Sequence, residues 1–258
     1  MTRPRRPGRL LLAAALAPLL ALAAAVTAAS LLTGTRTGSP AASARPVTPA
    51  GRPAFPAGRS ASPAGAAPPA VPVIPRTDLA GLRWSDYHGV QLPSSPAAGP
   101  RDTVGGLASG FADTPLGALL AAVNIAVRAN AQWGPGVFGP VIRRQVTGPD
   151  AAALLASCQA AYDQAARAGH ITGGQPLGNA YVTEQAFRWV SYTPLAATAD
   201  LVSAGPGSGG LTVRAVTRVQ VTWDGSDWQV IAPPGGDWGN AAAQLGSLQG
   251  YILFPGQG

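Results

Sequence analysis

The sequence predicts an α+β protein: a single transmembrane helix and a disordered linker, then a curved antiparallel four-stranded sheet with two helices on one face. Three observations support this class. Residues 10–32 are uncharged, residues 113–169 carry helical periodicity, and residues 178–234 alternate apolar and polar side chains with a period of two. Helices followed by strands with short connections favour an antiparallel sheet whose helices lie on one face.

The amino-terminal segment predicts a membrane anchor. Four arginines lie within residues 1–9, and residues 10–32 then continue for 23 residues without a charge. As a helix they extend about 35 Å, enough to cross a hydrocarbon core of about 30 Å. The basic arm, residues 1–9, places the amino terminus in the cytoplasm and the remainder outside. A cleaved signal peptide is the alternative; we favour the anchor because secretory apolar cores are usually shorter.

Residues 33–77 predict a disordered, extended linker. They are built mainly of Ala, Pro, Ser, Gly, Thr and Arg, with ten prolines and almost no side chain large enough to pack. At about 3.1 Å per residue, a fully extended chain of this length reaches about 140 Å. We therefore expect residues 78–258 to form an extracytoplasmic α+β domain on a long tether.

The charge distribution argues against nucleic-acid binding. The net charge of +7 arises in residues 1–77, which hold nine arginines and no acidic residue. Residues 78–258 hold nine arginines against eleven acidic residues, and only Arg143 and Arg144 are adjacent there. One cysteine, Cys158, excludes an intrachain disulfide, and two histidines are too few for a closed zinc site with it. We expect neither a metal nor a cofactor.

Two helices are predicted ahead of the strands. The first begins at Thr114 and Pro115, a capping side chain followed by proline at the first helical position, and runs to about Ala131. Apolar residues cover most of its circumference, so it should be largely buried. The second, from Pro149 to Gly169, is amphipathic and should lie at the surface. The polar stripe of the first helix, which faces solvent or lines a pocket, consists of Gly117, Ala121, Asn124 and Arg128.

Residues 82–100 predict a segment that lays aromatic side chains on the core. Asp86 and His88 within it are an alternative acid/base pair or pocket lining. Residues two apart point the same way only on a strand, and no third orienting group is evident, which favours the structural interpretation.

Residues 133–148 are too rich in Gly and Pro for a regular element, yet they carry large apolar side chains. Such a segment either folds onto the core or docks a partner. Aromatic and arginine side chains are enriched at interface hot spots. The predicted partner-binding residues are Trp133, Phe138, Arg143 and Arg144.

The strand region ends in a hairpin. Residues 211–223 and 228–234 flank the turn 224–227, and pairing Trp223 with Trp228 puts Val221 opposite Val230 on one apolar face. Two strands are expected before it, over residues 178–192 and 195–204. Strict alternation in the first of these places Phe187 on one face, and Glu184 with Arg188 on the other.

The order of helices and strands, closing with VTWDGSDWQV, resembles the cone-shaped fold named after nuclear transport factor two over about residues 111–234. The short arm, single span and long linker are similar to bitopic scaffold proteins of type IV secretion and conjugation machines. The strings WSDYHGVQLPSSPAAGP, FADTPLGALLAAVNIAVR and APPGGDW resemble actinobacterial envelope proteins associated with conjugative elements. The resemblance implies a fold and a cellular setting, and it fixes no activity.

The expected function is a non-enzymatic extracytoplasmic scaffold or assembly protein of a conjugation or type IV secretion-like envelope machine. It would lie in the cell membrane, with envelope or channel proteins or a second copy of itself as partners. The alternative is a small-ligand-binding or cell-envelope accessory protein, serving lipid transport or the cell wall, that uses a pocket in the cone. The pocket candidates are Asn124, Arg128, Asp86 and His88. Catalysis is not expected, because the pattern pairs no nucleophile with a base.

Overall fold

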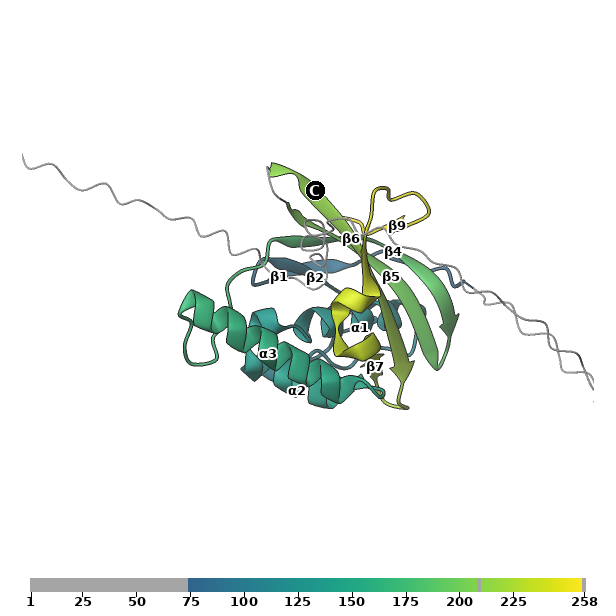
Figure 1. The fold of residues 1–258 in the computed structure, drawn as a ribbon. Helices are drawn as coiled ribbons and strands as arrows, with labels where there is room; N and C mark the ends of the chain where they lie inside the picture. The colour runs from purple at the N-terminus through teal and green to yellow at the C-terminus, as the bar shows by residue number, and fades with distance from the viewer. Residues whose placement is uncertain (1–73, 208–209, 257–258) are drawn as a thin grey trace, which may run out of the picture. The chain divides into compact units, whose positions relative to one another are not determined.

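The computed structural model describes residues 74–207 and 210–256, and in these residues three α-helices pack on a curled mixed sheet (Figure 1). The α+β class is confirmed. The predicted arm, the span over residues 10–32 and the linker up to residue 73 lie outside the described residues. Within the described ranges, no helix combines the length and the apolar character needed to cross a membrane.

Three long antiparallel strands form the centre of the sheet. They are β4 (Val182–Thr193), β5 (Ala196–Pro206) and β6 (Thr212–Trp223). The main path runs β1-β2-β4-β5-β6-β7-β3, while β8 pairs with β6 and β9 with β4. The shorter strands are β1 (Arg83–Tyr87), β2 (Val90–Ser94), β3 (Val146–Thr147), β7 (Trp228–Ile231), β8 (Ala242–Gln244) and β9 (Ile252–Leu253).

The sheet differs from the predicted four-stranded antiparallel one in two respects. The pairs β2–β4 and β3–β7 are parallel, so the sheet is mixed. In addition, β1, β2, β3, β8 and β9 were not expected. β3, β8 and β9 have only two or three residues, which is too short for a period of two to stand out in a sequence. β1 and β2 have five residues each, but they include Asp86 and Pro93, residue types that are uncommon in strands.

The β6–β7 hairpin has the predicted register. Trp223 pairs with Trp228, and Val221 pairs with Val230. The carboxylate of Asp227 accepts hydrogen bonds from the backbone N–H groups of residues 110 (2.7 Å) and 111 (3.1 Å), and the indole of Trp228 donates to the carbonyl of Ala112 (2.9 Å). These bonds tie the hairpin to the segment that leads into the first helix.

Two of the three helices were predicted. α1 (Pro115–Arg128) begins where Thr114 Oγ1 accepts a hydrogen bond from the Gly117 N–H at 3.1 Å. α3 (Ala151–Gly169) ends at His170, in the left-handed region. The unexpected helix is α2 (Pro135–Gln145), in the segment predicted to be irregular. Its first proline occupies the first helical position, where no N–H is needed. Tertiary packing of an apolar face outweighs the weak propensity of its glycines.

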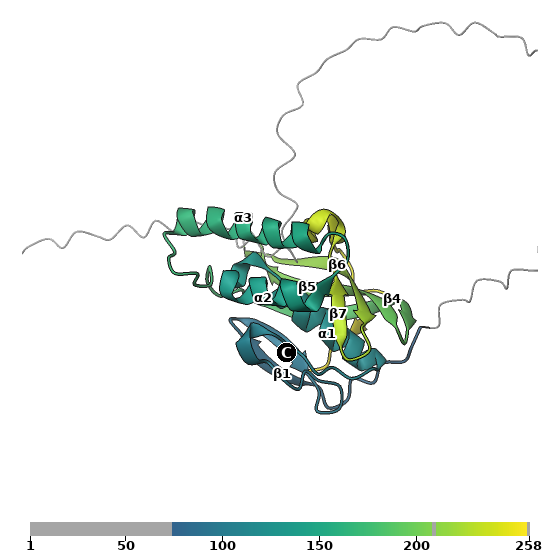
Figure 2. The ribbon, with the colours of Figure 1, turned by 90° about the horizontal axis from the view of Figure 1, so that it is seen from below.

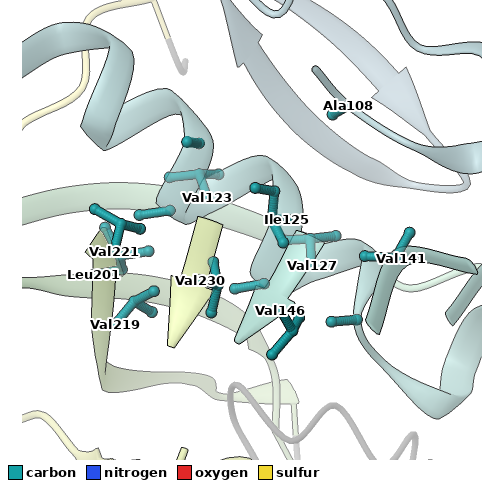
Figure 3. Packing of buried hydrophobic residues seen from close by; sticks show 14 of the residues in the cluster. Ala108, Val123, Ile125, Val127, Val141, Val146, Leu201, Val219, Val221 and Val230 are labelled. Carbon is teal, nitrogen blue, oxygen red and sulfur yellow. The ribbon is translucent and has the colours of Figure 1, made fainter. Parts of the chain in front are cut away.

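The hydrophobic core lies between α1 and the sheet (Figure 3). α1 packs against β2, β5, β6 and β7 on one side and against α2 on the other. In Figure 2, α3 and the β1–β2 hairpin lie on opposite sides of α2. Leu201, Val219 and Val230 show which face of the strands meets α1, and we call this the inner face. The opposite face of β4, β5 and β6 is the outer face.

Candidate functional site

The outer face carries three aligned charged residues, one on each central strand. Side chains alternate between the two faces of a strand, so Asp200, which follows a residue of the inner face and precedes another, points outward. In the sheet register Arg188 of β4 lies opposite Asp200 of β5, and Asp200 lies opposite Arg218 of β6. The three residues thus form a row across the sheet.

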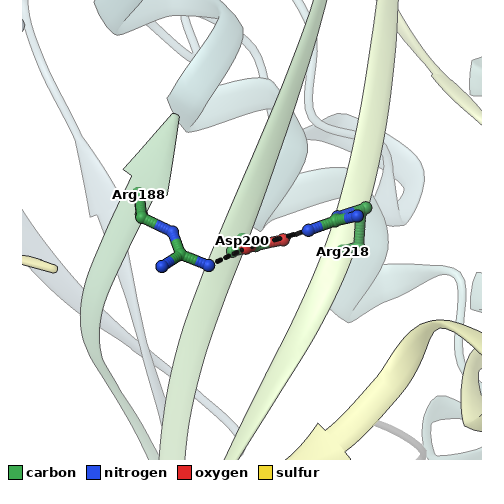
Figure 4. Close-up of polar contacts among 3 residues, drawn as sticks. All are labelled: Arg188, Asp200 and Arg218. Carbon is green, nitrogen blue, oxygen red and sulfur yellow. Dashed lines mark hydrogen bonds and ion pairs between the residues drawn. The ribbon is translucent and has the colours of Figure 1, made fainter. Parts of the chain in front are cut away.

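The Asp200 carboxylate binds both guanidinium groups (Figure 4). Arg188 Nη2 donates to Oδ2 at 2.7 Å, while Arg218 donates from Nε to Oδ1 at 2.8 Å and from Nη2 to Oδ2 at 3.2 Å. The Asp200 side chain is only 4% exposed, whereas those of Arg188 and Arg218 are 47% and 51% exposed. A buried acid therefore holds two half-exposed cations in defined positions.

These contacts keep all three groups charged. Burial alone raises the pKa of Asp200, but the hydrogen bonds and positive charges of Arg218 and Arg188 bring that pKa below its ordinary value. The hydrogen bond to Asp200 raises the pKa of Arg188 and that of Arg218. The row consequently presents two positive charges and one negative charge at neutral pH.

Further residues extend this row along the outer face. Arg214, on the same face of β6 as Arg218, donates from Nε to Gln185 Oε1 at 2.7 Å. The guanidinium carbon of Arg188 lies 4.6 Å from the centre of the Tyr251 ring. Next to β4, Leu253 pairs with Ala186 and is 59% exposed. We call this set the outer-face strip; it consists of Arg188, Asp200, Arg214, Arg218, Tyr251 and Leu253.

A second buried carboxyl group lies on the inner face. Glu184 of β4 is 1% exposed, pairs in register with Ser203, and has no hydrogen-bond partner for either carboxyl oxygen among the described residues. Burial raises its pKa to about 7. This corrects the strict alternation expected from the sequence. A β-bulge between Glu184 and Ala186 inserts an extra residue, which puts Glu184 on the same face as Phe187.

The predicted partner-binding residues do not form one surface. Trp133 and Phe138 are 1% and 0% exposed, and the Trp133 indole donates to the Val127 carbonyl at 2.6 Å. A docking role for these two residues is therefore wrong, because both belong to the core. Arg143 and Arg144 are exposed on the last turn of α2, where partner binding stays a prediction.

The polar stripe of α1 is buried rather than solvent-facing. Asn124 donates from Nδ2 to the carbonyls of Pro93 (2.9 Å) and Leu120 (3.0 Å), and its Oδ1 accepts from Arg128 Nη1 at 2.8 Å. Arg128 lies over the Tyr87 ring at 4.6 Å, and burial lowers the pKa of Arg128. The structure brings this predicted pair together and packs it against β1 and β2.

Asp86 and His88 shape the turn between β1 and β2. The Asp86 carboxylate accepts hydrogen bonds from the Gly89 N–H at 3.2 Å and from Gln91 Nε2 at 3.2 Å. His88 is exposed and stacks on Trp133, with ring centres 5.6 Å apart. Its backbone is left-handed, with φ of 52°. The contacts of Asp86 thus go to the turn rather than to His88.

The remaining candidates for chemistry do not include the arginines or the carboxylate of the outer-face strip. Cys158 is buried in α3, and desolvation raises the pKa of its thiol to about 12, so it stays protonated. A hollow next to Leu253 is lined by residues 77–82, Trp84, Leu253, Pro255 and Gly256. Among the residues that the structure describes, no group of three or more His, Cys, Asp or Glu side chains could hold a metal ion.

Sequence reasoning missed Asp200, although a signal was present. It is the single charged residue in the mostly apolar run 195–204, between two strands that each carry arginine. A lone charge in a central strand needs a partner when it is buried. The neighbouring strands supply Arg188 and Arg218 as the candidate partners of this charge.

The chain matches the family model described as a domain of unknown function (DUF8175) over residues 21–253. Because this match covers most of the sequence, the protein belongs to that family. No curated protein and no solved structure matches the chain.

Proposed function

We propose that this member of the DUF8175 family is a non-enzymatic extracytoplasmic scaffold or assembly protein of a conjugation or type IV secretion-like envelope machine, which docks its partners on the outer-face strip. The observation that carries the proposal is the buried Asp200 carboxylate holding two half-exposed guanidinium groups. This arrangement favours a role of the surface in binding another protein, because its charged groups are held in defined positions.

An arginine side chain that is already held in place loses less conformational entropy when a partner binds. A long side chain that swings freely in the unbound protein loses that freedom in a complex, at an estimated 0.5–1.5 kcal/mol for each immobilised side chain. Asp200 already restricts Arg188 and Arg218 before any partner arrives. Tyr251 and Leu253 add aromatic and apolar surface beside them. Tyrosine and arginine are enriched at protein interfaces.

The cellular setting follows from the sequence. An anchor over residues 10–32 and a linker over residues 33–77 would hold the folded domain outside the membrane, within reach of other envelope proteins. The resemblance to envelope proteins of conjugative elements supports conjugative transfer as the process served. The outer-face strip supplies the contact, and the anchor supplies the location.

The test uses the full chain in a host that carries out conjugative transfer. Replacing Arg188 and Arg218 by glutamine should lower the transfer frequency and the recovery of co-purified envelope proteins, at unchanged protein abundance. The matched control replaces Arg83 and Arg167, two exposed arginines on β1 and α3, by glutamine. Transfer and co-purification that persist in the Arg188/Arg218 variant would refute the proposal. A defect confined to an Arg143→Gln/Arg144→Gln variant would instead locate the docking site on α2.

Glu184 favours a second candidate, a small-ligand-binding or cell-envelope accessory function. A buried carboxyl group without a hydrogen-bond partner is a group that a bound ligand would satisfy. Native mass spectrometry of the purified full chain tests this directly. A co-purified small molecule that is present in the wild type and absent from Glu184→Gln would support it, and identical ligand-free spectra would remove it.

A further inference from the structure

We infer that the outer-face strip recognises an acidic segment of a partner protein, whose carboxylates bind the solvent-facing N–H groups of Arg188 and Arg218. The inference rests on the proposed function and adds the chemistry of the partner.

The two arginines have more hydrogen-bond donors than Asp200 uses. A guanidinium group has five N–H donors and no acceptor. Asp200 takes one bond from Arg188 and two from Arg218, which leaves most of their donors outside this ion pair. Because both arginine side chains are about half exposed, these donors are accessible from the outer face. A planar guanidinium fork is best matched by an oxyanion such as a carboxylate, which can accept two parallel hydrogen bonds.

The outer-face strip carries a net positive charge. Three guanidinium groups, those of Arg188, Arg214 and Arg218, share the outer face with the single carboxylate of Asp200. The hydrogen bond to Asp200 raises the pKa of Arg188, against a small opposing effect from repulsion by the positive charge of Arg218. A second carboxylate arriving from solvent would reduce that repulsion. The other buried acid, Glu184, lies on the opposite face of the sheet.

The side chains beside the arginines favour a protein partner over a phosphate polymer. The Tyr251 ring lies against Arg188, and Leu253 is 59% exposed beside β4. A partner that covers both the arginines and these side chains must combine anionic with apolar groups. A polypeptide with acidic and apolar residues does so, whereas a polyphosphate chain offers charge alone.

The spacing of the arginines sets the length of the segment. Arg188 and Arg218 lie on strands that flank β5, so their backbones are about 10 Å apart at about 4.8 Å per strand spacing. Arg214 precedes Arg218 by four residues on β6, which adds about 13 Å along the strand. An extended acidic segment of about four to five residues spans either distance.

The experiment measures binding of a fluorescent ten-residue peptide to the full-length protein in detergent micelles. In the peptide, pairs of glutamates alternate with pairs of leucine or tyrosine, so that each face of the extended chain carries both carboxylates and apolar side chains. Fluorescence anisotropy should show binding that weakens as salt is raised. The Arg188→Gln/Arg218→Gln variant should weaken binding by roughly tenfold or more, equivalent to about 1.4 kcal/mol. The Arg83→Gln/Arg167→Gln variant should bind like the wild type, and a peptide with glutamine in place of glutamate should not bind.

Four outcomes would overturn the inference. Equal binding of the glutamine peptide would show that carboxylates are not recognised. Equal weakening in both arginine variants would show that only total charge matters. Binding of inorganic polyphosphate without binding of the glutamate peptide would identify a polyanion as the partner. In the fourth outcome, the glutamate peptide does not bind, while the Arg188→Gln/Arg218→Gln variant still loses its co-purified envelope proteins. The proposed docking function then stands, and recognition of an acidic segment is refuted.

Discussion

Two buried carboxyl groups on neighbouring strands of the sheet have opposite environments. Asp200 on the outer face accepts hydrogen bonds from two arginines, and its pKa lies below the ordinary value. Glu184 on the inner face has no hydrogen-bond partner among the described residues, and burial raises its pKa to about 7. Desolvation raises the pKa of both groups, and the two arginine partners of Asp200 more than reverse this effect there.

This difference separates the roles of the two faces. Asp200 acts on the surface, because it fixes the positions of cations that reach solvent. Glu184 acts on stability, because an ionised carboxyl group without a partner is costly in an apolar interior. The two acids therefore predict opposite responses of folding to pH.

The largest expected effect is the loss of stability caused by Glu184 at rising pH. Its pKa is about 7 in the folded protein against an ordinary value of 4.5, so ionisation favours the unfolded chain. Stability should fall as pH rises from about 4.5 to about 7, by about 3 kcal/mol in total. Glu184→Gln should remove this dependence. Urea unfolding of the full chain, followed by tryptophan fluorescence at several pH values, measures it; parallel pH profiles for the two proteins would contradict the prediction.

Asp200 should produce a smaller effect in the opposite direction of pH. Because its folded-state pKa is lowered, its contribution is present above its ordinary pKa and is lost as pH falls through the folded pKa. Asp200→Asn should therefore destabilise the protein near neutral pH, by about 2 kcal/mol, the scale of hydrogen bonds to charged groups. The same unfolding assay measures it. A variant as stable as the wild type at pH 7, yet with the same profile in acid, would show that the ion pairs contribute nothing.

The smallest expected effects come from the two arginines taken singly. Arg218 makes two hydrogen bonds to Asp200 and Arg188 makes one, so Arg218→Gln should destabilise the protein more than Arg188→Gln. Both changes should stay below about 1 kcal/mol, because the guanidinium groups are half exposed. Thermal unfolding of the two variants side by side tests the order, and the reverse order would show that the cation–π contact of Arg188 with Tyr251 dominates.

Long periodic patterns made part of the fold predictable. α1, α3 and the β6–β7 register follow from capping residues, helical spacing and alternation that are all visible in the sequence. α2 was missed because its glycines and prolines conceal an apolar face that only the core reveals. For the same reason Trp133 and Phe138, expected at a surface, are buried.

The candidate site was less predictable, because it depends on contacts between strands. The partners of Asp200 lie 12 and 18 residues away, and only the register of the sheet aligns them. Glu184 was assigned to the wrong face because a one-residue bulge reverses the alternation, and no residue type in the sequence marks that bulge. Alternation in the sequence marks the two arginines as polar positions of their strands. It does not show that both bind the same carboxylate.

Site-specific crosslinking in living cells tests the docking role of the outer-face strip most directly. A photocrosslinking amino acid at Gln220, an exposed position on the outer face of β6, should capture a partner protein. The same amino acid at Gln164, exposed on α3, should not. The Gln220 crosslink should disappear when Arg188 and Arg218 are replaced by glutamine. Crosslinks from Gln164 alone, or a Gln220 crosslink that persists without the two arginines, would contradict the account.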